Sequence, residues 1–144
     1  MNSLLLYLRF NARGFVYSAA LSPAVAAAAL AAFELIGREG AARRSRLMSN
    51  VRYFIQRLRN ANFDIGNSAS AIVPILLGSE VLAFDLARRC NLEGLYATPV
   101  THPVVPKGAE RLRMNVTCDH RRKDLDFAIK VLQRSRTAEI ARAA

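Results

Sequence analysis

The chain has 144 residues, of which 52% are hydrophobic and 22% charged. This composition is typical of one globular domain, or a large piece of one, and excludes a largely disordered chain. The formal net charge is +10, and arginine supplies almost all of the excess. Such a charge attracts phosphates, nucleic acids or acidic membranes. The arginines are spread over several segments rather than gathered with aromatic residues into one stripe, which favours a solvated face and predicts no nucleic-acid partner.

The cysteine spacing and the hydropathy of the chain indicate its cellular compartment and whether it spans a membrane. Cys90 and Cys118 are isolated and lack the spacing of a metal site or a disulfide framework, so we expect no metal and a reducing cytoplasm. Residues 1–7 are apolar but lack the charged region and cleavage site of a signal peptide. Residues 15–36 are long enough for a membrane span, but they are rich in alanine and broken by Ser22 and Pro23. We expect no membrane span.

Two helical segments are predicted in the first part of the chain. Ser22 and Pro23 form a cap followed by a favourable first helical residue. Residues 24–36 are apolar on every side, which predicts a helix buried between other elements. Gly37 and Gly40 then interrupt this pattern. Residues 41–61 repeat apolar positions every three or four residues and carry arginines mostly on the other faces, which predicts an amphipathic helix.

The middle of the chain predicts a βαβ unit. Residues 63–65 are a short strand candidate, and residues 71–77 are a second strand that Pro74 restricts to an edge or a bulge. Gly78 and Ser79 end this strand and cap a helix over residues 79–91. A further strand is expected to begin at residues 95–97.

The last third predicts a loop, a strand and a helix. Three prolines indicate an extended loop over residues 98–108. Residues 111–116 alternate polar and apolar side chains, which is typical of a strand with one polar face. Residues 119–136 form the last predicted helix.

The residues themselves give no complete catalytic set, because phosphate loops, paired buried carboxylates and nucleophile elbows are all missing. His102 and His120 are candidate bases, although a structural or solvated histidine is the simpler interpretation. Arg111 and Arg113 project from the same face of a predicted strand and follow a proline-stiffened loop. They could bind an anion such as an amino-acid carboxylate, or they could be a solvated strand edge.

Several motifs in order resemble the carboxy-terminal third of the α-oxoamine synthases, a family that includes serine palmitoyltransferase and 8-amino-7-oxononanoate synthase. The motifs, in chain order, are Gly14-Phe15-Val16-Tyr17-Ser18 with Leu21-Ser22-Pro23-Ala24, Ile72-Val73-Pro74-Ile75 with Gly78, Gly94-Leu95-Tyr96 with Pro99-Val100 and Pro103-Val104-Val105-Pro106, and Arg111-Leu112-Arg113 with His120 seven residues later. No single motif is specific, but the ordered set covers nearly the whole chain.

The resemblance implies an α/β fold, namely the carboxy-terminal small domain of a fold-type I pyridoxal-phosphate enzyme with the end of its large domain and a long connecting helix. By this likeness, residues 1–22 end the large cofactor-binding domain, residues 23–62 form the connecting helices, and residues 63–144 form the small α/β domain. Members of this family are homodimers that bind the cofactor between the two domains.

The same resemblance implies two binding residues. Arg113 aligns with the family arginine that holds the carboxylate of the substrate amino acid. Ser18 lies where relatives place hydroxyl residues near the cofactor phosphate of the neighbouring subunit. Ala19 and Ala20 stand where relatives often carry another hydroxyl, which weakens this second assignment.

The resemblance also implies a missing group. The family's Schiff-base lysine belongs to a segment that precedes these motifs, and Lys107, Lys123 and Lys130 do not match its context. We therefore expect no catalytic residue in this chain and no condensation of an amino acid with acyl-CoA by the chain alone. The chain would be a partial synthase, and the DNA upstream of Met1 would encode the lysine segment. The alternatives are a non-catalytic partner of a full-length synthase subunit and a small basic nucleic-acid-binding protein.

Overall fold

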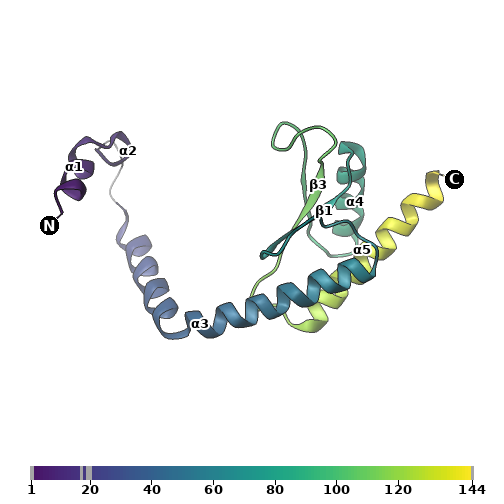
Figure 1. The fold of residues 1–144 in the computed structure, drawn as a ribbon, viewed down its shortest axis with the longest axis horizontal. Coiled ribbons are helices and arrows are strands. Elements are labelled where there is room, and N and C mark those ends of the chain that lie inside the picture. The colour runs from purple at the N-terminus through teal and green to yellow at the C-terminus, as the bar shows by residue number, and fades with distance from the viewer. Residues whose placement is uncertain (1, 17, 19–20, 144) are drawn as a thin grey trace. The chain divides into compact units, whose positions relative to one another are not determined.

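The structure is a computed structural model that describes residues 2–16, 18 and 21–143, with residues 137–143 described as backbone only. It consists of two compact units, Met1–Gly40 and Ala41–Ala144. One long helix, α3 (Pro23–Asn60), belongs to both units (Figure 1).

The first unit contains α1 (Ser3–Asn11), α2 (Arg13–Val16) and the beginning of α3. The predicted start of α3 is confirmed, since the Ser22 hydroxyl accepts a hydrogen bond from the Val25 amide at 3.4 Å. The predicted interruption at Gly37 and Gly40 is wrong, because α3 continues through both residues. A helical glycine costs only about 1 kcal/mol relative to alanine, and the strong helix formers around these two offset it.

The predicted burial of residues 24–36 does not occur in this structure. Four large apolar side chains of this part of α3 are at least 53% exposed, namely Val25, Leu30, Phe33 and Ile36. A helix that is apolar on every side needs covering elements on every side. The described part of the first unit adds only two short helices to α3.

The second unit contains a three-stranded sheet made of β1 (Ile72–Leu76), β2 (Thr98–Val100) and β3 (Arg111–Asn115). The strand order is β1-β3-β2, and both outer strands run antiparallel to β3. β1 and β2 are therefore parallel to each other, as a βαβ unit requires, but β3 is inserted between them. The predicted edge position of Pro74 is confirmed, because β1 is an outer strand.

Two strand predictions need correction. Residues 63–65 are not a strand, although Phe63 and Ile65 are buried and the Asp64 carbonyl accepts a hydrogen bond from the Leu76 amide at 2.8 Å. The strand expected to begin at residues 95–97 lies instead at Thr98–Val100, inside the predicted loop. Pro99 is tolerated there because β2 is also an edge strand.

Two further helices complete the second unit, α4 (Glu80–Leu92) and α5 (Arg122–Ala143). Ser79 occupies the predicted cap position of α4, but its side chain makes no capping hydrogen bond. α5 begins three residues later than predicted, because the preceding residues form a turn that hydrogen-bonds to α3.

The core lies on one face of the sheet. β3 alternates in burial, with Leu112 and Met114 facing inward and Arg113 and Asn115 exposed. The inward side chains of β1 and β3 pack with side chains of α3, α4 and α5 in one cluster, which includes Phe54, Leu58, Val73, Ile75, Leu86, Cys90, Leu125 and Leu132. The opposite face of the sheet, which carries Arg111 and Arg113, is therefore left for a site.

One buried carboxylate predicts a stabilising substitution. Glu110 is only 5% exposed, and its Oε2 has no hydrogen-bond partner among the residues that the structure describes. A buried unsatisfied acceptor costs about 1–3 kcal/mol. Glu110→Met, which keeps the length of the side chain and removes both oxygens, should raise the free energy of unfolding by a similar amount, measured by urea denaturation. Glu110→Gln, which keeps an acceptor, should gain less, and a loss of stability in the methionine variant would contradict this interpretation.

Candidate functional site

The candidate site lies on β3, and the pleat of this strand decides which side chains face it. Arg111 and Arg113 are two residues apart on one strand, so both side chains project from the same face, as predicted. Arg113 pairs with Pro74 of β1 on one side and with Thr98 of β2 on the other. Its backbone is therefore held in the centre of the sheet, which fixes the point from which the guanidinium extends.

A groove of about 540 Å³ lies over this face, and both arginines line it. Its other lining residues are uncharged: Ile65, Gly66, Asn67, Ser68, Ser70, Ile72, Pro74, Leu76, Val100 and Val104. The Arg111 Nε donates a hydrogen bond to the Ala109 carbonyl at 2.8 Å. Within the part of the chain that the structure describes, no side chain forms a hydrogen bond or ion pair with the Arg113 guanidinium. The groove therefore presents positive charge without a matching carboxylate.

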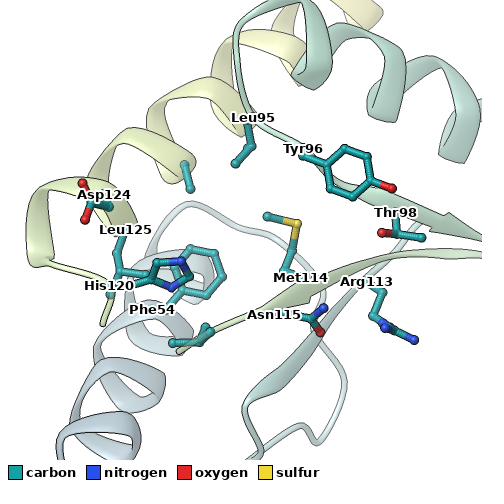
Figure 2. A pocket seen from close by; sticks show the side chains of 12 residues that line it. Phe54, Leu95, Tyr96, Thr98, Arg113, Met114, Asn115, His120, Asp124 and Leu125 are labelled. Atoms are coloured by element: carbon teal, nitrogen blue, oxygen red, sulfur yellow. The ribbon is translucent and has the colours of Figure 1, made fainter. Parts of the chain in front are cut away.

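A second, smaller cavity of about 250 Å³ lies along β3, and Arg113 lines it too. The rings of Phe54 and His120 lie together at one end, whereas Arg113 lies at the other and points away from them (Figure 2). Met114 and Leu125 add apolar surface between α3, β3 and α5. Arg113 thus lies at the boundary between two hollows, each of which has a mostly apolar lining.

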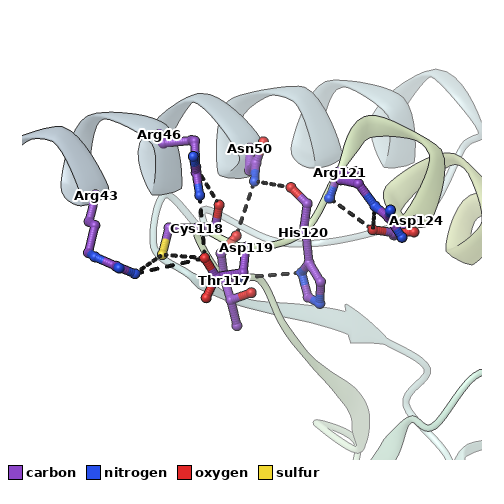
Figure 3. A network of polar contacts seen from close by, with 9 residues as sticks. All are labelled: Arg43, Arg46, Asn50, Thr117, Cys118, Asp119, His120, Arg121 and Asp124. Carbon is purple, nitrogen blue, oxygen red and sulfur yellow. Dashed lines mark hydrogen bonds and ion pairs between the residues drawn. The ribbon is translucent and has the colours of Figure 1, made fainter.

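His120 has a structural role in this arrangement. Its Nδ1 accepts a hydrogen bond from the Thr117 amide at 3.2 Å, which leaves the ring hydrogen on Nε2 when the imidazole is neutral. Asn50 on α3 donates to the carbonyls of His120 at 2.8 Å and Thr117 at 3.1 Å, and Arg46 donates to the Cys118 carbonyl at 2.8 Å (Figure 3). These bonds fasten the turn between β3 and α5 to α3.

Sequence reasoning missed Asn50. It is only 5% exposed and joins α3 to the turn that carries His120. The available signal was a polar residue on the apolar side of the helix, between Leu47 and Phe54. A buried amide needs partners, so its position predicts a hydrogen-bonded turn beside the helix.

Asp124 lines the smaller cavity and stays ionised. The Arg121 amide donates to its Oδ2 at 2.9 Å, and the Arg121 Nε does so at 3.2 Å. These bonds stabilise the charged carboxylate and lower its pKa below the ordinary value. The Asp124 carboxylate therefore accepts hydrogen bonds from Arg121 at the start of α5, and it is a poor candidate for a general acid.

The other predicted residues lie apart from the arginine pair. His102 is exposed and lines neither hollow at Arg113. Lys107, Lys123 and Lys130 are likewise exposed and line neither hollow. None of the three lysines therefore lines a hollow beside Arg113.

Ser18 belongs to the first unit, so the structure does not relate its position to that of Arg113. It is exposed, and its hydroxyl donates a hydrogen bond to the Phe15 carbonyl at 2.8 Å. Tyr17 of the same motif and the neighbouring Ala19 and Ala20 lie outside the described residues.

No helix that the structure describes is both long enough and apolar enough to span a membrane. In the same described residues, no group of three or more histidine, cysteine and acidic side chains is arranged to hold a metal ion.

Comparison with known sequences identifies the relatives of the chain. Residues 2–132 match the family described as aminotransferase class I and II. The 8-amino-7-oxononanoate synthase of Thermoanaerobacter pseudethanolicus is 35% identical over 128 residues, which cover 89% of this chain and 32% of the relative. A 4-hydroxy-2,2'-bipyrrole-5-methanol synthase of a Serratia species is 38% identical over 126 residues, which cover 88% of this chain and 19% of the relative. The chain thus spans at most about a third of these curated relatives.

Solved structures give the same result for the fold. A serine palmitoyltransferase of Sphingomonas wittichii matches 95% of this chain with a TM-score of 0.87 and 25% identity, and the match covers 35% of that enzyme. A serine palmitoyltransferase solved with pyridoxal phosphate as an internal aldimine matches with a TM-score of 0.89 and 24% identity, again over 95% of this chain and 35% of the enzyme. The resemblance to α-oxoamine synthases is therefore confirmed, and the chain belongs to the aminotransferase class I and II family of pyridoxal-phosphate-dependent proteins.

Proposed function

We propose that this chain supplies the part of the active site that binds the substrate carboxylate in a pyridoxal-phosphate-dependent acyltransferase. Such an enzyme condenses an amino acid with an acyl-CoA thioester and releases carbon dioxide. The observation that carries the proposal is the guanidinium of Arg113, which the central strand projects into a groove. Among the residues that the structure describes, none pairs with this guanidinium through its side chain, and no acidic residue lines the groove. A planar guanidinium binds a carboxylate through two parallel hydrogen bonds, which gives both affinity and orientation.

The cofactor fits this chain only in part. Pyridoxal phosphate, when bound, withdraws electrons from the bond that breaks at the α-carbon of the amino acid. Arg113 would hold the amino-acid carboxylate and orient that bond. The three lysines are exposed away from Arg113, so we infer that the Schiff-base lysine lies outside these 144 residues and that the chain alone does not catalyse the condensation.

If Ser18 binds the cofactor phosphate, its hydroxyl must donate a hydrogen bond to a phosphate oxygen. A phosphate oxygen needs a hydrogen-bond donor, but the single hydroxyl hydrogen of Ser18 is donated to the Phe15 carbonyl. Ser18 would have to rotate its hydroxyl to bind a phosphate. We therefore assign the carboxylate contact of Arg113 as the principal role of this chain and the phosphate contact of Ser18 as a secondary one.

The carboxylate role is tested by comparing L-alanine with ethylamine, which is alanine without its carboxylate. We expect L-alanine to shift amide NMR resonances of β1, β2 and β3 in a saturable way in the 144-residue chain, and ethylamine to cause no saturable shift. Equal responses to the two ligands would show that the carboxylate is not recognised.

A second candidate role is that of a partner that pairs with a full-length synthase subunit or with a second copy of the chain. The observation in its favour is the exposed apolar surface of the first unit, where six residues of α1 are at least 36% exposed: Leu4, Leu5, Leu6, Tyr7, Leu8 and Phe10. Exposed apolar patches of this kind mark protein interfaces. Copurification with a full-length synthase would support this role, and a stable monodisperse monomer would count against it.

A further inference from the structure

The outer face of α4 carries three large apolar side chains, Val81, Phe84 and Leu92, each of which is at least 52% exposed. Together with the exposed Arg88 they occupy positions i, i+3, i+7 and i+11 of the helix. Residues with this spacing lie on one side of an α-helix. The three apolar side chains and the arginine therefore form one continuous strip of surface, here called the α4 stripe.

The opposite side of α4 already belongs to the core. The buried residues of the helix are Ala83, Leu86, Ala87 and Cys90. A helix that packs on a core with one side normally presents polar and charged residues to water on the other side. Because α4 is apolar on both sides, and because exposed apolar patches mark interaction sites, we infer that a further element covers the α4 stripe.

The shape of the α4 stripe favours a second helix as the covering element. From Val81 to Leu92 the stripe follows the helix for three turns, which corresponds to about 16 Å of rise. A helix that packs lengthwise on another helix inserts its side-chain ridges into the grooves of its neighbour along such a length. An amphipathic helix would therefore bury all three apolar side chains of the stripe at once.

Arg88 determines the charge that this covering helix needs. It lies between Phe84 and Leu92, and in the described part of the chain no side chain forms a hydrogen bond or ion pair with it. A helix on the stripe removes Arg88 from water, which is costly unless a carboxylate pairs with the guanidinium. The net charge of +10 on the whole chain attracts an acidic partner as well.

A second copy of this chain fits the α4 stripe poorly. Two stripes related by a twofold axis run antiparallel, and Arg88 lies less than one turn from the middle of the stripe. The two arginines would therefore meet within about one turn of each other, where like charges repel. We propose that the α4 stripe is the docking site for an amphipathic helix of a separate protein, which presents a carboxylate between apolar side chains.

The test uses two helical peptides of about five turns and identical composition. In the first peptide one glutamate stands among leucines on the apolar face, and in the second this glutamate exchanges places with a lysine of the polar face. In NMR titrations of the 144-residue chain, the first peptide should shift amide resonances of α4 in a saturable way. It should bind at least about fivefold more tightly than the second. The absence of a saturable shift, or equal affinities for the two peptides, would refute the proposal.

Three variants separate the α4 stripe from general charge attraction. Phe84→Ala should weaken binding of the first peptide about tenfold, because a large apolar contact is lost. Arg88→Glu should reverse the preference, so that the second peptide binds more tightly. Arg52→Glu is the matched control, because Arg52 is exposed on α3 and the net charge changes equally. It should keep the preference of the parent chain. A preference that persists in Arg88→Glu, or that reverses in Arg52→Glu, contradicts the role of Arg88.

Two further measurements test the nature of the partner. In sedimentation experiments, a dimer of the chain that Phe84→Ala dissociates would assign the α4 stripe to a second copy and overturn the proposal. In a form of the protein that also binds the cofactor, the first peptide should bind with the same affinity to within about twofold. Loss of binding there would show that the protein's own polypeptide covers the stripe.

Discussion

Replacing Arg113 with alanine is expected to weaken binding of L-alanine to this chain by at least about 100-fold, so that binding is no longer measurable. Two charge-assisted hydrogen bonds contribute about 1.5–3 kcal/mol each, and every 1.4 kcal/mol corresponds to a factor of ten in affinity. Arg113 is exposed and forms no hydrogen bond or ion pair with a side chain in the described part of the protein. Its removal should therefore leave the stability of the fold nearly unchanged. NMR titration measures the affinity, and thermal unfolding checks the fold.

Arg88→Ala is the matched control, because Arg88 is also exposed but lies on α4 and lines neither hollow beside β3. It should bind L-alanine like the parent chain. Arg113→Lys should bind with intermediate affinity, since an ammonium keeps the charge but loses the planar fork. In a form of the protein that also binds the cofactor, Arg113→Ala should weaken amino-acid binding much more than cofactor binding. Equal effects on both would show that the arginine is wrongly assigned.

Replacing Phe54 with alanine should lower the free energy of unfolding by about 3–5 kcal/mol, which is the usual cost of removing a buried phenylalanine. Phe54 is 2% exposed and belongs to the core cluster that joins α3 to the sheet and to α5. It also lines the smaller cavity beside His120, so the substitution would enlarge an existing hollow. Urea denaturation followed by circular dichroism measures the change.

Phe84→Ala provides the comparison for this prediction. Phe84 lies on α4 and is 52% exposed, so its removal leaves no cavity and should change stability by no more than about 0.5 kcal/mol. If the two variants lose similar amounts of stability, the packing of α3 on the sheet has been described wrongly.

Some features of the site follow from local pattern alone. The alternation from Arg111 onward predicted a strand with both arginines on one face, and β3 has that form. Pro74 predicted an edge strand or a bulge because proline has no amide hydrogen to donate, and β1 is an edge strand. The ordered motifs indicated the family, which the comparisons confirmed. The assignments of Arg113 and Ser18 remain predictions.

Other features could not be read from the sequence, because they depend on partners distant along the chain. Local pattern placed a strand at residues 95–97, but the register with β3 selects Thr98–Val100. The glycines of α3 predicted a break in the helix. Helix formation depends on the helix propensities summed over all residues of the segment, and the other residues outweigh the two glycines. Asn50 acquired a role only when the turn at residues 117–120 folded against it.

The sequence by itself determined the family, the amphipathic part of α3 and the placement of two arginines on one strand face, because these depend on residue order and on the periods of helix and strand. The tertiary structure alone decided that β3 is the central strand, that the helices cover the face opposite the arginines and that the described lining of the groove contains no acidic side chain. These properties arise from pairing and packing between segments that are far apart in the chain, which the period of one segment does not encode.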